Sequence, residues 1–438
     1  MYFLYGIALA IVLALSAPAW LWAMARHGKY RAGLRERFGR VPERLTRLPK
    51  APRAPAAPGC VWVHAVSVGE VLAVSELVGK LREQWPQARI VVSTTTNTGQ
   101  MLARHRFGEE NVFYFPLDFA FAIRGYLRAL QPELIVIAET EFWPNFLRLA
   151  RASGARVAVV NARISDRSFP RYRRFRPLMR RILRNVDLFL AQSQEDGRRL
   201  IAIGAAADRV RVAGNLKFDA APPRQAPFAA ELRQRLQKAG AFPVLVCGST
   251  VEDEELALLA TFQVLLEKYP KSFMVLAPRR PERFDEVARL MQAFKRVPCW
   301  RRSRLPDDAL LCGGILLLDS IGELASLYSL ATLAIVGGSL APRGGHNILE
   351  PAFFGVPILV GPHTENFRDI VSVFRAQDAV RVVHAFSSDG ARADLTDTIA
   401  ALIEDSAGRE RLGRNAAETL RAQAGAAART AKELEILL

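Results

Sequence analysis

Cysteine is scarce in this sequence, and the few cysteines present are not grouped. Cys60, Cys247, Cys299 and Cys312 are scattered along the chain without C-x-x-C spacing. This pattern indicates neither a disulfide framework nor a zinc site. We therefore expect buried thiols in a reducing compartment.

Acidic residues are also few in comparison with basic ones. The chain has 43 Asp and Glu against 60 Lys and Arg, which gives a formal net charge of +17. A charge of this size requires an acidic partner. The candidates are a membrane surface, a nucleic acid or a phosphorylated substrate.

Charged side chains are absent altogether from residues 2–25. A helix of about 24 residues at 1.5 Å each is roughly 36 Å long, enough to cross a hydrocarbon core of about 30 Å. A cleaved signal peptide is the alternative, but no Lys or Arg precedes the apolar stretch. We predict a single transmembrane anchor over residues 2–25.

The segment that follows the anchor, residues 26–54, is strongly basic. Glu36 and Glu43 are its only acidic residues. The positive-inside rule therefore places the rest of the chain in the cytoplasm, and the same charges would hold anionic lipid headgroups. The anchor favours a membrane surface and a phosphorylated substrate, rather than nucleic acid, as partners.

Short apolar runs separated by helical periodicity predict an α/β architecture of parallel strands. A proline-rich linker, residues 218–227, divides the runs into two sets. We predict two doubly wound domains, at 55–217 and 228–438, with ligands bound beyond the carboxyl ends of the strands and between the facing domains. The predicted strands are 61–66, 90–93, 112–115, 134–138, 157–160, 188–191 and 210–213, then 244–247, 273–277, 315–318, 331–336 and 357–360.

A glycine-rich segment, Gly337–Pro351, joins the predicted strand at 331–336 to a polar helix start. Exposed backbone N–H groups and a positive helix end suit an anion, so the segment is interpreted as a phosphate or nucleotide cradle. Glycine in tight turns is the structural alternative.

Carboxylates follow several strands of the first domain. Glu70 opens a predicted helix, where the macrodipole keeps a carboxylate ionised, as a general base requires. The spacing Ser67-x-x-Glu70 equally fits a capping box. Glu139 and Glu141 are two residues apart, so they either act together on a ligand or pair with Arg163 and Arg167.

The second domain offers a comparable set at its strand ends. Ser249 and Thr250 fit a helix N-cap or a cleft-facing site, and Arg279 is placed to meet phosphate. The turn Asp319–Glu323 supplies free N–H groups. Glu350 either caps a helix together with Asn347 or accepts hydrogen bonds from a ribose diol.

These motifs, in this order and over essentially the whole chain, resemble the 3-deoxy-D-manno-octulosonic acid (Kdo) transferases of lipopolysaccharide synthesis. Ala65, Val66 and the segment Leu340–Arg343 depart from the family pattern. The resemblance rests on His64–Glu70, Glu139–Asn145, Asn161–Ser165, Gly214–Asp219, Asp319–Leu324, Gly344–Pro351 and Gly361–Phe367.

The resemblance implies a GT-B glycosyltransferase that moves Kdo from CMP-Kdo to the glucosamine disaccharide of a lipid A precursor, at the cytoplasmic face of the bacterial inner membrane. It implies that Glu70 is the general base of an inverting transfer, supported by Glu139, Lys217 and Arg163. No metal or other cofactor is expected, because no Asp-x-Asp pair is present. The residues implied in CMP binding are Ser249, Thr250, Arg279, Ile321, Gly322, Glu323, Asn347 and Glu350.

The stretch Arg171–Val186 has an apolar stripe with arginines around it. The stripe is either core or the membrane-facing side of an amphipathic helix, and the arginines suit the acceptor's phosphates and anionic lipid. Two other functions stay open: a membrane-bound GT-B enzyme with a different nucleotide-sugar donor, and a non-catalytic module that binds anionic lipid.

Overall fold

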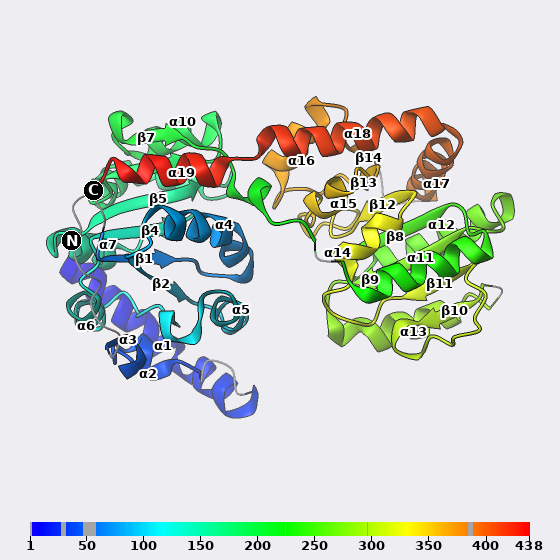
Figure 1. The fold of residues 1–438 in the computed structure, drawn as a ribbon. Helices are drawn as coiled ribbons and strands as arrows, with labels where there is room; N and C mark the ends of the chain where they lie inside the picture. Colours follow the sequence, from blue (N-terminus) through cyan, green and yellow to red (C-terminus); the bar gives the residue numbers. More distant parts are fainter. Residues whose placement is uncertain (1, 28–31, 47–57, 224, 296, 384–388) are drawn as a thin grey trace. The chain divides into compact units, whose positions relative to one another are not determined.

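The computed structural model describes residues 2–27, 32–46, 58–223, 225–295, 297–383 and 389–438. The chain forms two compact units (Figure 1). Unit 1 comprises Met1–Ala221 and Gln423–Leu438, and unit 2 comprises Pro222–Ala422. Each contains a parallel sheet of seven strands with helices on both faces, so the predicted pair of doubly wound domains is confirmed.

The sheet of unit 1 has the strand order β3-β2-β1-β4-β5-β6-β7. Most of its strands are near-continuous apolar runs, because both faces of the sheet are covered, whereas the edge strand β7 is partly exposed. They are β1 (Cys60–His64), β2 (Arg89–Thr94), β3 (Val112–Tyr114), β4 (Leu134–Ala138), β5 (Arg156–Ala162), β6 (Leu188–Ala191) and β7 (Val210–Val212).

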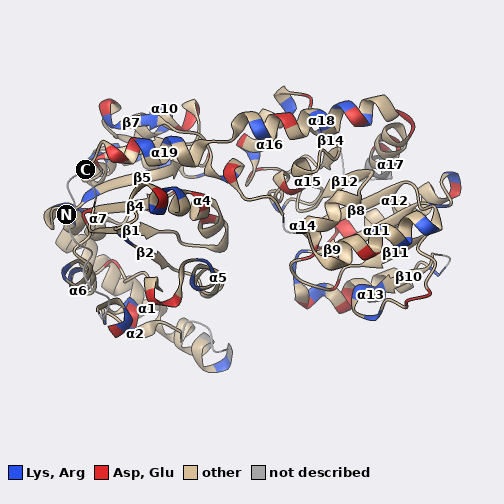
Figure 2. Ribbon diagram, viewed as in Figure 1, with Lys and Arg blue, Asp and Glu red and all other residues tan. Residues whose placement is uncertain are grey.

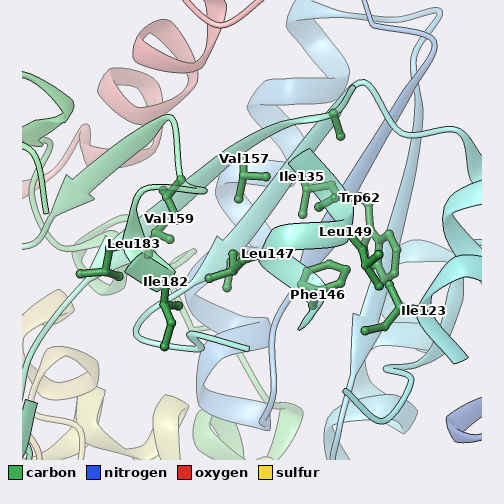
Figure 3. Packing of buried hydrophobic residues seen from close by; sticks show 14 of the residues in the cluster. Trp62, Ile123, Ile135, Phe146, Leu147, Leu149, Val157, Val159, Ile182 and Leu183 are labelled. Atoms are coloured by element: carbon green, nitrogen blue, oxygen red, sulfur yellow. The ribbon is translucent and has the colours of Figure 1, made fainter. Parts of the chain in front are cut away.

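Two buried clusters fill the two faces of this sheet. One contains Trp62, Ile135 and Val157 from the strands, with Phe146, Leu147 and Ile182 from the helices that cover them (Figure 3). Those helices are α3 (Glu43–Thr46), α6 (Ala120–Leu130), α7 (Pro144–Ala152), α9 (Arg176–Leu183) and α10 (Gln194–Ile203), with α8 (Phe169–Arg174) alongside. The opposite face carries α4 (Val68–Gln84), α5 (Asn97–Phe107) and α19 (Ala426–Glu435).

The second domain ends earlier than the sequence predicts, because helix α19 packs on unit 1. Residues 423–438 belong to unit 1, although the sequence predicts domain 228–438. The reason is hydrophobic: Ala426, Ala427, Ala431 and Leu434 are buried in the cluster that α4 shares. The carboxylate of Asp219 also accepts the amides of Gly425 and Ala427. Asp219 and Phe218, predicted as linker, are therefore held within unit 1.

Unit 2 has the strand order β10-β11-β9-β8-β12-β13-β14. The predicted strands of both units are present, and unit 2 adds the short strands β10 and β14 at its edges. The strands are β8 (Val244–Thr250), β9 (Phe273–Pro278), β10 (Cys299–Arg301), β11 (Gly314–Leu317), β12 (Leu333–Val336), β13 (Ile358–Val360) and β14 (Arg381–Val382). The helices are α11 (Pro227–Ala239), α12 (Glu254–Lys268), α13 (Phe284–Gln292), α14 (Leu324–Leu327), α15 (Leu349–Phe353), α16 (Arg368–Ala376), α17 (Asp389–Glu404) and α18 (Ser406–Gln423).

Helix α1 (Tyr2–His27) is the one helix of the described residues that is long and apolar enough to cross a membrane. A signal sequence would pass the same test of length and composition. Its first turn lies against unit 1. Asn185 Nδ2 donates to the Tyr2 hydroxyl at 3.2 Å, and the Arg148 guanidinium lies 4.8 Å from the centre of the Tyr2 ring.

The basic segment that follows α1 is partly folded onto the sheet. Its residues 32–46 are described and include α2 (Leu34–Arg37), whereas 28–31 and 47–54 lie outside the described residues. The Glu36 carboxylate accepts the Tyr114 amide of edge strand β3 and also binds Arg44, both at 2.8 Å. Arg37 donates to the Thr95 carbonyl. Arg37 and Arg44 thus bind protein groups, where the sequence predicts headgroup contacts.

Candidate active site at the carboxyl ends of the strands

Glu70 lies in the first turn of α4, directly after β1 and its loop. Its carboxylate accepts the Val66 amide at 2.8 Å and the Ser67 hydroxyl at 3.1 Å. The Val66 carbonyl in turn accepts the amides of Thr95 and Thr96, both at 3.1 Å, from the loop after β2. Ser67 makes no side-chain cap to the helix, and Glu70 accepts the amide of Val66 rather than that of Ser67, so the predicted capping box does not form.

The surroundings of Glu70 suit a group that takes up a proton near neutral pH. Burial, together with the charges of Glu139 and Glu141, raises the pKa of its carboxyl to about 7. The bonds from Val66 and Ser67 act in the opposite direction, but burial outweighs them. A carboxyl tuned to this range is well matched to general-base chemistry.

Glu139 and Lys217 form an ion pair close to Glu70. Glu139 follows β4 with a left-handed backbone (φ 55°), and its carboxylate lies 3.6 Å from the Lys217 ammonium. Lys217 is positioned by its neighbours: Asn215 Oδ1 accepts its amide, and Asn161 Oδ1 accepts the amide of Leu216, each at 3.0 Å. The structure therefore brings three predicted residues together, with Lys217 as the partner of Glu139.

Glu141 and Arg163 belong to the loops of the same edge. Burial raises the pKa of Glu141, and the charge of Glu139 adds to this effect. Arg163 is half-buried in the loop after β5. Asp118, which sequence reasoning missed, is buried after β3, where it accepts the amides of Asn145 at 3.0 Å and Phe146 at 2.7 Å at the start of α7. Nothing in the sequence near Asp118 links it to a segment 27 residues away.

In unit 2 the predicted residues gather at the ends of β8, β9 and β12. Ser249, the next-to-last residue of β8, has a left-handed backbone (φ 57°), and Thr250 beside it is buried. The Arg279 amide donates to the Thr250 carbonyl at 2.8 Å, and its exposed side chain faces solvent. His346 Nδ1 lies 2.9 Å from the Gly337 carbonyl. Burial lowers the pKa of His346, and the charge of Arg279 lowers it further.

Asn347 and Glu350 contact one another beside Arg279. Asn347 Nδ2 donates to Glu350 at 3.2 Å, and its Oδ1 accepts the Leu349 amide at the start of α15. Burial raises the pKa of Glu350, while Asn347 and the charge of Arg279 oppose that rise. Asn347 thus accepts the first amide of α15, as the capping alternative predicts, and ribose binding by Glu350 stays a prediction.

The turn after β11 is held from outside by arginines. The Asp319 carboxylate accepts from Arg301 at 2.8 Å and from the Ser303 amide at 2.8 Å, which lowers its pKa against the effect of burial. Glu323 binds Arg302 at 3.3 Å. These contacts leave Ile321 81% exposed and give Gly322 a left-handed backbone (φ 90°). Because β11 neighbours β9 in parallel, the turn lies on the edge that also carries Arg279.

The glycine-rich loop differs from the predicted phosphate cradle. Three of its amides, those of Gly338, Leu340 and Ala341, donate to the carboxylate of Glu254, at 2.8, 2.9 and 3.1 Å. The amide of Val251 donates to the same carboxylate at 3.0 Å. The helix that follows, α15, has only five residues and begins at Leu349. The anion that this loop binds is an internal side chain.

Glu254 lies in the first turn of α12. The structure gives it 0% exposure, because Asp253 has a left-handed backbone (φ 76°) that turns the chain inward. Within the part of the chain that the structure describes, no group of three His, Cys, Asp or Glu residues is arranged to hold a metal ion.

Comparison with known proteins identifies the family. Residues 32–220 match the model of the family described as "3-Deoxy-D-manno-octulosonic-acid transferase (kdotransferase)". The chain is 36% identical over 429 residues to the 3-deoxy-D-manno-octulosonic acid transferase of Bordetella pertussis, covering 95% of each chain. It is 33% identical over 369 residues to the enzyme of that name from Haemophilus influenzae, covering 84% of each.

A solved structure shows the same fold at much lower identity. The glycosyltransferase from Rickettsia africae matches with a TM-score of 0.57 at 12% identity, covering 86% of this chain and 97% of that chain. This likeness supports the GT-B fold predicted from the sequence. The two strongly similar relatives cover most of their own length as well as most of this chain. This chain therefore belongs to the 3-deoxy-D-manno-octulosonic acid transferase family of glycosyltransferases.

Proposed function

We propose that this protein transfers Kdo from CMP-Kdo to the glucosamine disaccharide of a lipid A precursor, lipid IVA, with inversion at the anomeric carbon. Family membership supports the sugar and the donor. The observation that carries the mechanism is Glu70, a carboxylate at the strand ends whose pKa is raised to about 7 beside Glu139 and Lys217.

In the proposed reaction, Glu70 removes the proton from an acceptor hydroxyl as that oxygen attacks the anomeric carbon of Kdo. The bond from this carbon to the phosphate oxygen breaks, and CMP leaves with the bonding electrons. Glu70 is then neutral until it releases its proton to solvent. Lys217 holds Glu139, so that a positive charge compensates one of the neighbouring carboxylates while the base is ionised.

The donor is proposed to bind the edge of unit 2. Arg279 supplies a fixed positive charge for the single phosphate of CMP, and the free N–H groups of the Ile321–Glu323 turn and the carboxylate of Glu350 suit the nucleoside. Ser249, Thr250 and Asn347 complete this set. No metal is assigned a role in these steps.

The proposed location is the cytoplasmic face of the bacterial inner membrane, with α1 as a single membrane-spanning anchor and anionic lipid beside the basic surface. Length, apolar composition and the basic residues after α1 support this topology. If α1 spans the membrane, its C-terminal, basic end lies on the same side as unit 1 and Tyr2 lies on the opposite side. Tyr2 then cannot keep its contacts with unit 1. Insertion would therefore separate Tyr2 from Asn185 and Arg148.

The test is transfer from CMP-Kdo to detergent-dispersed lipid IVA in the presence of EDTA, with products identified by mass. We expect sugar addition by the wild type and a loss of about 10²–10⁴-fold in rate for Glu70→Gln, the contribution typical of a general base. Glu83→Gln, an exposed site at the far end of α4, is the matched control. Equal activity of the two variants would refute Glu70 as the base.

The same assay separates the proposal from its alternatives. Transfer from another nucleotide sugar, with none from CMP-Kdo, would identify a different donor. Lipid binding without any transfer by the folded wild type would favour a binding module. Loss of transfer in EDTA, restored by a divalent ion, would show that a metal takes part.

A further inference from the structure

Four of the helices on one face of unit 1 carry positive charge without any negative charge, whereas α3 and α10 on the same face contain acidic residues. Helices α6, α7, α8 and α9 contain two, two, three and three arginines, and none of the four contains Asp or Glu. Figure 2 shows the acidic residues on other parts of the chain, such as α4 and α19. The steps of the proposed transfer assign no role to these four helices.

A pocket of about 640 Å³ lies on this face between α9 and the end of α10. Pockets that bind ligands typically have volumes of about 300–1,000 Å³. No acidic residue lines the pocket, whereas the neighbouring pocket between α6 and α7 includes Glu133. The arginines that line it are Arg176, Arg180, Arg181, Arg184 and Arg209.

Most of these arginines have no carboxylate partner. Arg176, Arg180, Arg181 and Arg184 are exposed, and no ion pair joins any of them to the residues that the structure describes. Arg209 is different, because its guanidinium donates to the carbonyls of Arg184 at 3.2 Å and Val186 at 2.9 Å. It holds the backbone at the end of α9, so that the other four can project from a fixed surface.

The nearest acidic side chains do not neutralise this cluster. The Asp187 carboxylate is held by Arg151 at 3.2 Å and Arg156 at 3.7 Å. Asp208 is exposed in the turn before β7 and does not line the pocket. A group of guanidinium ions this close together is stable only if water or an anion screens it. Guanidinium binds phosphate oxygens in a bidentate manner.

Exposed apolar side chains accompany the arginines. The stripe predicted on Arg171–Val186 divides: Met179, Ile182 and Leu183 are buried in the core, but Phe175 is 53% and Leu178 is 43% exposed. Ile201, which lines the pocket, is 38% exposed. Arginine beside exposed aromatic and aliphatic groups is the composition of surfaces that bind anionic membranes.

We propose that the pocket between α9 and α10 binds the phosphate headgroup of an anionic phospholipid, with Phe175, Leu178 and Ile201 against its acyl chains. This inference rests on the proposed membrane location, and it gives unit 1 a membrane contact separate from α1. The ligand is a lipid of the bilayer, rather than the donor or acceptor of the transfer.

The test uses the full chain in a neutral detergent and a short-chain lipid, dihexanoylphosphatidylglycerol, as the probe in calorimetric titration. The pocket variant carries Arg176→Gln, Arg180→Gln and Arg184→Gln. The matched variant carries Arg171→Gln, Arg173→Gln and Arg174→Gln, which removes the same charge from α8 outside the pocket. We expect the pocket variant to bind at least about tenfold more weakly and the matched variant within about threefold of the wild type.

Dihexanoylphosphatidylcholine and inorganic phosphate distinguish the sources of binding. Equal losses in the two triple variants would show a diffuse basic surface and overturn the pocket. Phosphate bound as tightly as phosphatidylglycerol would show an anion site without lipid preference, which would also overturn it, as would no binding by the wild type. Should the triple variant melt earlier than the wild type, Arg180→Gln alone replaces it, with an expected loss of about fivefold.

Transfer of Kdo measured on the same preparations separates this inference from the proposed function. Lipid binding without transfer would contradict the function alone. Transfer by a wild type that does not bind phosphatidylglycerol would contradict the lipid pocket alone.

Discussion

The buried carboxylate of Glu254 provides a sharp test of how the glycine-rich loop is held. Each of its two oxygens accepts two backbone amides. Oε1 accepts those of Leu340 and Ala341, and Oε2 accepts those of Gly338 and Val251. With 0% of the residue exposed, water cannot replace any of these bonds. The substitution Glu254→Gln keeps the shape of the side chain, so no cavity forms.

The expected cost follows from the number of bonds. A glutamine amide group would place its own N–H donors against two of the four backbone donors. Each hydrogen bond to a charged group is worth about 1.5–3 kcal/mol, so the loss of two destabilises the loop by about 3–6 kcal/mol. Because whole domains are stable by only about 5–15 kcal/mol, a large part of the stability of unit 2 is at stake.

Hydrogen exchange read by mass spectrometry on a peptide covering residues 337–343 measures this directly. We expect exchange in Glu254→Gln to be at least about a hundredfold faster than in the wild type, because opening becomes easier by about 3 kcal/mol or more. Glu252→Gln is the matched control: Glu252 is 67% exposed, and its distance to Arg343 is 3.9 Å. An exposed pair of this kind contributes about 0–1 kcal/mol. Unchanged exchange in Glu254→Gln, or equal acceleration in both variants, would refute the reasoning.

Three further predictions concern the other parts of the molecule. The transfer rate should fall as pH decreases through about 7, because a protonated Glu70 cannot accept a proton. Lys217→Met should move the midpoint of this profile to higher pH, because it leaves the negative charge of Glu139 without a positive partner. Lys217→Arg should return the midpoint to its wild-type value. An unmoved midpoint in rate-against-pH profiles would contradict the assignment. Asp118→Asn should lower the free energy of unfolding by about 1–3 kcal/mol in urea titration, since an amide replaces a buried carboxylate that accepts two amides of α7; no change would show that these bonds contribute little. In membrane vesicles, Tyr2→Cys should react with an impermeant maleimide only from the side opposite unit 1, and labelling from the same side would rule out a spanning α1.

Periodicity and strand-end position were sufficient to predict most of the architecture. Buried parallel strands are continuous apolar runs, which is why runs such as Leu134–Ala138 and Leu188–Ala191 coincide with observed strands. The edge strands β10 and β14 have two or three residues and include arginine, so no apolar run marks them. Helix α19 was assigned to the wrong unit because its alanine-rich stripe does not reveal which sheet it covers.

Site residues near strand ends could be predicted from the sequence. Contacts between side chains and segments far along the chain could not. Glu70, Glu139 and Lys217 come together because parallel strands bring their carboxyl ends to one edge. The inward turn of Glu254 depends on a left-handed Asp253, a conformation that its sequence does not announce. The capping of α7 by Asp118 joins segments whose proximity only the sheet order determines.

The return of the chain to unit 1 has a consequence for biosynthesis. Helix α19 packs on α4, the helix that carries Glu70, yet the ribosome makes it after the whole of unit 2. During translation the part of α4 that α19 covers stays uncovered while roughly 200 residues of unit 2 emerge and fold, at about 5–20 residues per second. Unit 2 can thus be complete before unit 1. For some tens of seconds the nascent chain therefore displays a first unit that still lacks its last helix.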